Sequence, residues 1–294
     1  MDPNPAGPRI GIFGGSGLYR MEGLTEVREQ VVDTPYGAPS DALLLGKLNG
    51  VDVAFLARHG RSHGLIPSQI PFRANVYAMK ALGVQYLLSV SAVGSMREDI
   101  APLDMILPDQ FIDFTRKREG SFFGDGAVAH VSMADPVCDV LRGVLAESFA
   151  DAGFADVRLH PQGTYVCIEG PAFSTRAESI WYCSLGAAVI GMTNTPEARL
   201  AREAEIAYAT LALCTDWDCW HPHQACVTAE MAIANLQANA KRAQTLLTHA
   251  VQRIATSWPA SAAHTALGSA LVTPIAAMSA EVRARLQPLI SRLL

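Results

Sequence analysis

Residues 207–214 (Ala-Tyr-Ala-Thr-Leu-Ala-Leu-Cys) form an almost unbroken apolar run. Such a run is typical of a strand that is buried on both faces, as in the sheets of α/β proteins. Two similar runs, at 85–91 and 187–190, follow segments that we expect to be helical, at 69–82 and 176–185. Strands that alternate with helices predict an α/β fold, a single domain with a mixed central β-sheet flanked by helices.

Composition and charge exclude several classes of protein. Half of the 294 residues (50%) are hydrophobic, so the chain can bury a large core. A net charge of −5 without any Lys/Arg cluster argues against a nucleic-acid-binding surface. No apolar run has the length of a membrane span, and the Pro-rich residues 1–8, which we expect to be disordered, lack signal-peptide features. Because the six cysteines include no Cys-x-x-Cys pair, we expect a reducing, cytoplasmic environment.

Polar or glycine-rich clusters follow six of the predicted strands. They lie at 14–17, 58–60, 91–95, 169–175, 191–193 and 215–220. In open α/β sheets, ligands bind beyond the carboxyl ends of the strands. We therefore expect these clusters, although they are far apart in the sequence, to converge on one active site.

Asp216 and Asp218 lie on either side of Trp217, directly after the apolar run. Burial at a strand end would raise the pKa of at least one of these carboxyl groups and keep a proton available near neutral pH. Such a pair can bind a nitrogen base and activate it as a leaving group. Two aspartates in this spacing are, on their own, more typical of a solvated loop, so the prediction depends on the other clusters.

Two of the clusters contain groups that bind anions. Residues 14–17 (Gly-Gly-Ser-Gly) can surround an anion with backbone N–H groups, although a plain tight turn has the same composition. The dinucleotide-binding fingerprint is absent, since Arg20 stands where a third small residue is required. Arg58 and His59 offer a forked cation and a second donor to a phosphate, with a surface arginine as the alternative. His59 and His63 have a metal-like spacing, but without a nearby acidic residue we predict no metal.

The remaining clusters supply neutral donors and apolar side chains. Ser91, the backbone of Ala92 and Thr193 can each donate a hydrogen bond, although each alone is typical of ordinary capping. Phe173 can stack on a heterocyclic base, and Met192 can cover the apolar face of a sugar. For Phe173 and Met192 the alternative is a place in the hydrophobic core.

Six motifs occur in register along the chain. They are Gly-Ile-Phe-Gly-Gly-Ser-Gly-Leu (11–18), Asp-Thr-Pro-Tyr-Gly-x-Pro-Ser-Asp (33–41), Ala-Arg-His-Gly-Arg (57–61), Glu-Gly-Pro-Ala-Phe-Ser-Thr-Arg-Ala-Glu (169–178), Gly-Met-Thr (191–193) and Thr-Asp-Trp-Asp-Cys-Trp (215–220). Together they resemble the 5′-methylthioadenosine phosphorylase family, in the trimeric branch of the purine nucleoside phosphorylases. The resemblance predicts a nucleoside phosphorylase-like domain over 9–257. The partly helical extension at 258–294 has no recognised counterpart.

The resemblance implies a role for each candidate residue. The residues implied to bind phosphate are Ser16, Arg58, His59, Ser91, Ala92 and Thr193. Those implied to bind the nucleoside are Met192 at the ribose, Phe173 and Ser174 beside the base, Asp216, Trp217 and Asp218 at the purine, and His130 at the 5′ end of a neighbouring subunit's substrate. Ala229 stands where a Val is common, which leaves more space in the 5′ pocket. The family is implied to use inorganic phosphate as co-substrate, with no metal or organic cofactor, in a homotrimer whose site lies near a subunit interface.

The implied reaction is the phosphorolysis of 5′-methylthioadenosine to adenine and 5-methylthioribose 1-phosphate, in purine and methionine salvage. The purine leaves easily only if its N7 is protonated or strongly hydrogen-bonded, so we expect Asp216 to be the general acid. Asp218 would accept from the 6-amino group, although the two roles can be shared or exchanged. An ionised pair favours 6-amino over 6-oxo purines.

Other functions stay open at this point. Within enzymes, the alternatives are an adenosine phosphorylase and a 5′-methylthioinosine phosphorylase. A hydrolytic nucleosidase is disfavoured because water has no use for Arg58 and the neutral donors. Outside enzymes, the alternative is a nucleoside-binding protein on the same fold.

Overall fold

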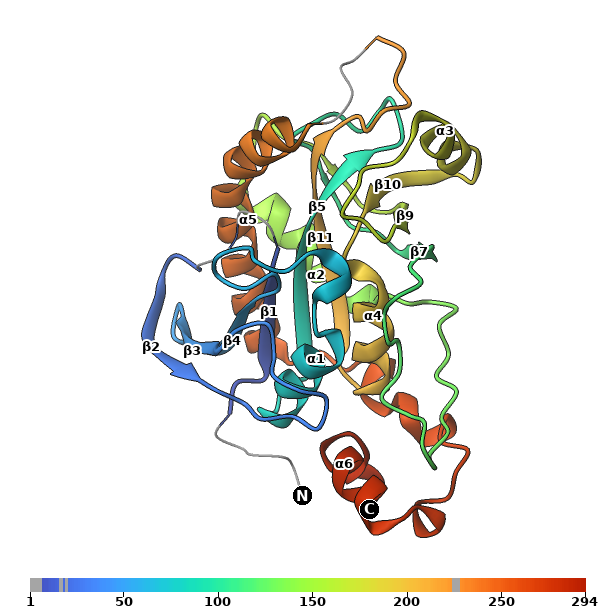
Figure 1. Cartoon of the computed structure of the whole chain (residues 1–294). Coiled ribbons are helices and arrows are strands. Elements are labelled where there is room, and N and C mark those ends of the chain that lie inside the picture. Colours follow the sequence, from blue (N-terminus) through green and yellow to red (C-terminus); the bar gives the residue numbers. More distant parts are fainter. Residues whose placement is uncertain (1–6, 16–17, 19–20, 224–227) are drawn as a thin grey trace.

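The computed structural model describes residues 7–15, 18, 21–223 and 228–294 (Figure 1). The expected disorder of residues 1–8 falls mostly outside this part of the chain. Ser16 also lies outside it.

The strands of the described chain form one mixed sheet, in the order β2-β3-β4-β1-β5-β10-β9-β7, and β11 pairs with both β5 and β6. Their bounds are β1 (Ile10–Gly14), β2 (Leu24–Gln30), β3 (Leu43–Leu48), β4 (Val51–Ala57), β5 (Tyr86–Ser95), β6 (Met105–Ile106), β7 (Gln110–Asp113), β8 (Leu159–His160), β9 (Thr164–Cys167), β10 (Ala187–Gly191) and β11 (Ala207–Asp216). β1, β4, β5 and β11 run parallel, whereas β3 pairs antiparallel with both β2 and β4. The predicted α/β fold with a mixed central sheet is confirmed.

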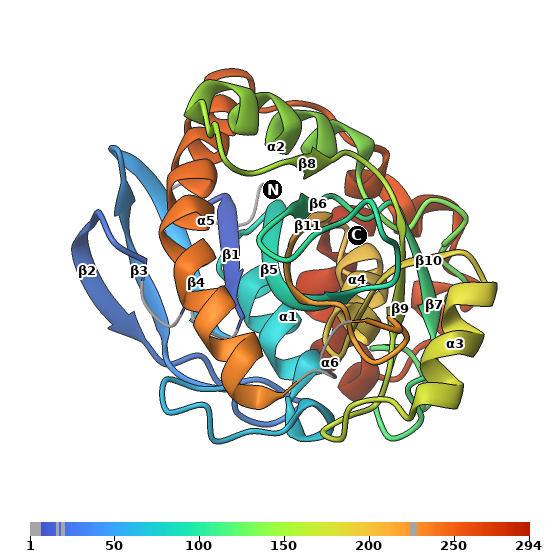
Figure 2. The same ribbon diagram turned by 90° about the horizontal axis from the view of Figure 1, so that it is seen from above.

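Helices cover both faces of the sheet (Figure 2). They are α1 (Phe72–Ala81), α2 (Asp139–Ala152), α3 (Arg176–Ser184), α4 (Asn194–Glu203), α5 (Ala229–Ser257) and α6 (Ala280–Ile290), with shorter 3₁₀ turns at η1 (Pro67–Gln69), η2 (Ala262–Ser269), η3 (Ile275–Ala277) and η4 (Ser291–Leu293). Alternate residues of β5 and β11 face opposite ways, as strand geometry requires. One face packs against α2 and α5, and the other against α1, α4 and α6. Of the helices in the described residues, none combines the length and the apolar character that a membrane crossing needs.

Asn49 and Gly50 connect β3 to β4, and both turn residues have positive φ (49° and 80°), as a type I′ turn requires. One predicted bound changes, since the strand expected at 85–91 continues to Ser95. The edge strand β2 was not predicted, because its side chains are mostly exposed and form no apolar run.

β5 changes partners along its length, and this change opens the sheet. Its first half pairs with β1 as far as Phe13 opposite Ser89, and its last residues pair with β10 at Gly94 and Ser95. Between these two pairings, residues 90–93 have β11 as a neighbour on one side only. The other side of this stretch is free to face a ligand.

The segment after Trp258 packs on the body of the protein. Met278, Val282 and Leu286 are buried against α1 and α4. Arg292 forms an ion pair with the buried Glu205 at the end of α4. α6 contacts α1 and lies at the lower end of the molecule in Figure 1. The predicted helix of this segment corresponds to α6.

Candidate active site

A cavity of about 320 Å³ lies where β5 changes partners, and α5 covers one side of it. This volume is within the range of small-molecule sites. Residues from all six predicted clusters line it together with the start of α5. The predicted site residues among them are Arg58, His59, Ser91, Ala92, Phe173, Ser174, Met192, Thr193, Asp216, Asp218 and Ala229. Gly15 of the cluster at 14–17 also lines it. The expected convergence of strand ends is therefore observed.

Three of the predicted site residues are not among those that line the cavity, and one of the three is not among the described residues. Ser16 is not among the described residues. Trp217 is not among the residues that line the cavity; its ring packs against Trp220, with 6.4 Å between ring centroids. His130 is exposed, and its backbone N–H donates to the carbonyl of Ala270 in the C-terminal segment. Its predicted contact with a neighbouring subunit's substrate stays a prediction.

The two aspartates form a buried pair at the end of β11. Each is only 4% exposed, although both line the cavity. The backbone N–H of Asp218 donates to Oδ1 of Asp216 at 2.8 Å, which fixes one carboxyl group relative to the other. Burial raises the pKa of both carboxyl groups above their usual values. The solvated-loop interpretation of the motif is therefore wrong for this chain.

The hydrogen bonds of Asp216 oppose the effect of its burial. The Thr215 hydroxyl donates to Oδ2 of Asp216 at 2.6 Å and lies 3.2 Å from the carbonyl oxygen of Val93. This bond and the bond from the backbone N–H of Asp218 stabilise the charged form of Asp216. Burial is the largest influence, so the pKa of Asp216 is still raised.

Asp218 is held by a residue that sequence analysis missed. Ser179 of α3 is fully buried, and its hydroxyl donates to Oδ2 of Asp218 at 2.5 Å. Burial raises the pKa of Asp218, and this hydrogen bond opposes the shift because it stabilises the charged form. A serine inside a helix gives no sequence signal for this contact, which joins residues far apart in the chain.

Gly94 allows β5 to pass directly beneath the carboxylates. A Cβ atom at Gly94 would lie 2.9 Å from Oδ1 of Asp216 and 3.4 Å from Cβ of Asp218. The first distance is shorter than a van der Waals contact, so any side chain here would displace the carboxyl group.

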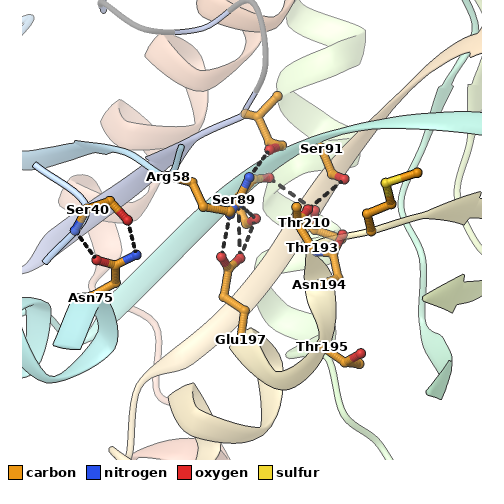
Figure 3. Close-up of polar contacts among 12 residues, drawn as sticks. Ser40, Arg58, Asn75, Ser89, Ser91, Thr193, Asn194, Thr195, Glu197 and Thr210 are labelled. Atoms are coloured by element: carbon orange, nitrogen blue, oxygen red, sulfur yellow. Dashed lines mark hydrogen bonds and ion pairs between the residues drawn. The ribbon is translucent and has the colours of Figure 1, made fainter. Parts of the chain in front are cut away.

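Arg58 also lines the cavity but is buried, and most of its donors are already used. Its side chain is 1% exposed, and Nε donates to Oε2 of Glu197 at 2.6 Å. Nη1 donates to the Val90 carbonyl, which β1 no longer reaches, and Nη2 donates to both Ser89 and Glu197. Figure 3 shows Arg58 and Glu197 pointing at each other, with Ser89 beside them. The surface-arginine alternative is therefore wrong.

The structure changes the role expected of His59. Its Nδ1 lies 2.8 Å from the carbonyl oxygen of Leu65, which can only accept, so Nδ1 carries the hydrogen. Burial lowers the pKa of His59 to about 4, so the ring is neutral at pH 7. Nε2 of a neutral ring with hydrogen on Nδ1 is an acceptor. In this tautomer Nε2 of His59 offers a lone pair, whereas the sequence predicted that His59 would be a second donor.

Hydroxyl groups lie beside Arg58. The Ser91 Oγ lies 3.2 Å from Oγ1 of Thr193 and 3.1 Å from the hydroxyl of Tyr165, and all three residues are buried. Tyr165 was not predicted as part of the site because it lies inside the short apolar strand β9. The three hydroxyls form a neutral group that can donate or accept as a ligand requires.

The loop at 169–174 is positioned by a second buried arginine. The guanidinium of Arg118 forms an ion pair with Glu169 and donates to the carbonyl oxygens of Met192 and Thr195. Arg118 thereby joins the loop after β9 to the loop after β10. Glu169 is consequently used within the protein, and its carboxylate is not among the groups that line the cavity.

The base side of the cavity combines an apolar surface with one unsatisfied hydroxyl. Phe173 is 45% exposed and lines the cavity, so its ring is not in the core. The Ser174 Oγ is buried but has no hydrogen-bond partner among the described residues. Such an orphaned polar group is costly unless a ligand satisfies it.

The opposite end of the cavity is apolar. Ala229 and Ala232 of α5 line it together with Ile233, Leu236 and Ile66. Two small side chains at the start of α5 leave this end wide. Nowhere in the described part of the chain do three or more His, Cys, Asp or Glu side chains gather as a metal site would require.

The comparisons with known proteins agree with this geometry. The sequence matches the phosphorylase superfamily over residues 9–252. The S-methyl-5′-thioadenosine phosphorylase of Thermosynechococcus vestitus is 59% identical over 286 residues, which cover 97% of this chain and 99% of that protein. The chain belongs to the 5′-methylthioadenosine phosphorylase family.

Solved structures of the family share the fold. A crystal structure of a methylthioadenosine phosphorylase from an antarctic soil metagenomic library is 59% identical, with a TM-score of 0.92 over 96% of this chain and 99% of that one. The methylthioadenosine phosphorylase of Schistosoma mansoni in complex with adenine is 34% identical, with a TM-score of 0.83 over 85% of this chain and 93% of that one.

The family relationship corrects the expectation for the C-terminal segment. The alignment with the T. vestitus protein leaves only eight of the 294 residues of this chain uncovered. The segment after Trp258 therefore has a counterpart in that family member. Its sequence is rich in Ala, Ser and Thr, which gave no motif by which to recognise it.

Proposed function

We propose that this chain catalyses the phosphorolysis of 5′-methylthioadenosine to adenine and 5-methylthioribose 1-phosphate. The observation that carries the proposal is the placement of a buried carboxylate pair and a buried arginine with neutral hydroxyls in one cavity. Relatives 48–59% identical to this chain have the name S-methyl-5′-thioadenosine phosphorylase, which supports the substrate.

Inorganic phosphate would bind as the nucleophile between Arg58, Ser91 and Thr193, with the backbone of Ala92. Arg58 retains one Nη1 hydrogen without a partner among the described residues, and the two hydroxyls supply neutral donors. Because His59 presents an acceptor, it would receive a hydrogen from a protonated phosphate oxygen or a ribose hydroxyl. We include Ser16 in this group on the basis of the family resemblance alone.

The purine would lie between Phe173 and the carboxylate pair. Asp216, whose pKa is raised by burial, would protonate N7 as the glycosidic bond breaks through an oxocarbenium-like state. Asp218 would accept from the 6-amino group, and the Ser174 hydroxyl would gain its missing partner from the base edge. Met192, next to Gly170 in the loop after β9, would cover the ribose.

The wide apolar end of the cavity favours a second substrate. Ala229 would border the 5′ substituent and leave room for adenosine or for larger 5′-thio groups. A Schistosoma mansoni protein of this fold, 34% identical to this chain, is named adenosine/methylthioadenosine phosphorylase. An apolar pocket rejects an added hydroxyl only weakly, so adenosine is the second candidate. Replacing Ala229 by Val should lower the rate on bulky 5′-thio substrates about tenfold relative to methylthioadenosine.

We propose a cytoplasmic homotrimer that needs neither a metal nor an organic cofactor and that has neither nucleic acid nor a membrane as a partner. Because His130 and Trp217 do not line the cavity, in the trimer they would either contact the substrate of a neighbouring subunit or act on the substrate through other residues. Light scattering measures the subunit number, and activity after extensive dialysis against EDTA measures the metal requirement.

Initial rates on methylthioadenosine, adenosine and methylthioinosine, each with and without phosphate, test the proposal. We expect phosphate-dependent release of adenine, fastest from methylthioadenosine, with slower turnover of the 6-oxo substrate. Release of base without phosphate would indicate a nucleosidase instead. No turnover, together with thermal stabilisation by adenine, would indicate a nucleoside-binding protein.

A further inference from the structure

Glu197 of α4 is completely buried and does not itself line the cavity. Its Oε2 accepts from Nε of Arg58 at 2.6 Å. Its Oε1 accepts from Nη2 of Arg58 at 3.1 Å, from the Ser89 hydroxyl at 2.7 Å and from the Tyr208 hydroxyl at 2.9 Å. Figure 3 shows this carboxylate facing the Arg58 guanidinium, with Ser89 beside them. Four donors on two oxygens hold Glu197 in a single position.

The network determines what Arg58 can still offer. A guanidinium has five N–H groups. Glu197, Ser89 and the Val90 carbonyl take four of them, which leaves one hydrogen on Nη1 without a partner among the described residues. Nη1 lies near the glycine-rich turn, since a Cβ atom at Gly15 would be 3.2 Å from it. An anion in the cavity can therefore accept a hydrogen bond from only one N–H of Arg58. The two parallel bonds that an unpaired guanidinium can donate are not available to it.

The network also compensates the charge of Arg58. Charges interact strongly in a buried site, because little water screens them. The positive charge that would attract an anion is already paired with a carboxylate at hydrogen-bond distance. An anion that approaches Arg58 is attracted by the guanidinium and repelled by Glu197 behind it.

We propose that Glu197 is a positioning residue with two effects on phosphate binding. It keeps the affinity for phosphate low, and it fixes the direction from which Arg58 donates to the anion. It fixes the guanidinium with one N–H facing the cavity, and its charge lowers the affinity of the site for anions. The affinity is thereby kept low enough for a co-substrate that must enter and leave the site at every turnover. The inference rests on the proposed phosphate site at Arg58.

The test compares the wild type with Glu197→Gln by calorimetric titration of inorganic phosphate and by thermal unfolding. Glutamine keeps the size of the side chain and removes its charge. We expect Glu197→Gln to bind phosphate at least tenfold more tightly and to have a lower Tm without phosphate, because a buried cation then lacks its counter-ion. Phosphate should raise the Tm of the variant more than that of the wild type.

Two control variants separate charge and general stability from the proposed role. Glu205→Gln also removes a buried carboxylate from an ion pair, with Arg292, but Arg292, unlike Arg58, does not line the cavity. It should lower the Tm and leave the phosphate Kd unchanged. Glu197→Asp keeps the charge and shortens the side chain, so it should not tighten phosphate binding.

An unchanged or weaker phosphate affinity in Glu197→Gln would overturn the inference and leave the proposed function intact. Absence of phosphate binding by the wild type would contradict the proposed function itself. If Glu197→Gln unfolds in the absence of anion, phosphate should restore its circular dichroism spectrum. Unfolding that phosphate does not reverse would show that Glu197 is only structural.

Discussion

The Ser179 hydroxyl donates to Oδ2 of Asp218 across 2.5 Å, and this contact joins α3 to the end of β11. Through it, a helix that does not itself form a wall of the cavity holds a carboxylate that does, and the hydrogen bond favours the charged form of that carboxylate. Ser179 is fully buried, so water cannot replace its hydroxyl when the side chain is shortened.

Ser179→Ala should shift the pH dependence of catalysis. A carboxylate that loses a donor holds its proton more tightly, so the pKa of Asp218 rises further above its usual value. Because the ionised form is expected to accept from the 6-amino group, the acidic limb of the kcat/KM profile for methylthioadenosine should move to higher pH. Ser184→Ala, at the exposed end of the same helix, should leave the limb in place. An unshifted limb in Ser179→Ala would show that the contact has only a structural role.

Asp216→Asn should lower kcat on methylthioadenosine by about 10²–10⁴-fold, the usual contribution of a general acid. Asparagine keeps the shape of the side chain but has no acidic proton for N7. Steady-state rates at saturating phosphate measure the effect, and Asp99→Asn on the surface is the control. Turnover near the wild-type rate would exclude Asp216 as the acid.

His59 should make the protein less stable in mild acid. Burial lowers its pKa from 6.5 to about 4 in the folded state, whereas the unfolded chain binds a proton near pH 6.5. The unfolded state therefore binds more protons between these values, and stability falls as the pH drops from about 6.5 to about 4. The shift corresponds to at most about 3 kcal/mol.

Urea unfolding of the wild type and His59→Asn at pH 7 and pH 5 measures this effect. The variant should lose less free energy of unfolding between the two pH values than the wild type. His223→Asn, which changes an exposed histidine, should behave as the wild type does. Equal losses in His59→Asn and the wild type would contradict the expected neutral His59.

Gly94→Ala should reduce activity more than it reduces stability. The new methyl group would lie 2.9 Å from Oδ1 of Asp216 and push the carboxyl group out of place. In contrast, a Cβ atom at Gly143 in α2 meets no other atom within 4 Å. Gly143→Ala should therefore raise the free energy of unfolding by about 0.4–1 kcal/mol and leave kcat unchanged. Comparable kinetics for the two variants would show that the close approach at Gly94 is tolerated.

The elements that could be predicted from the sequence are those with a local signal. β5, β10 and β11 are apolar runs because both of their faces are buried, and Asn49-Gly50 marks its hairpin because few residues adopt positive φ. The convergence of the polar clusters followed from the geometry of an open sheet.

The residues that could not be predicted act through contacts between distant parts of the chain. Glu197 reads in sequence as an ordinary acidic residue in the first turn of a helix, yet it pairs with Arg58, 139 residues away. The hydrogen on Nδ1 of His59 is set by the Leu65 carbonyl, which no pattern of residue types reveals. Ser179 and Arg118 were missed for the same reason.

The partner change in β5 also limits how this protein can be re-engineered. A strand points successive side chains to opposite faces, so one residue inserted between Ser89 and Ser91 would turn Ser91 away from the cavity and move Gly94 from beneath Asp216. Point substitutions along this stretch can alter the two ends of the cavity separately. A change of length would disable both at once, so libraries aimed at new nucleoside substrates should vary residue identity in β5 and keep its length constant.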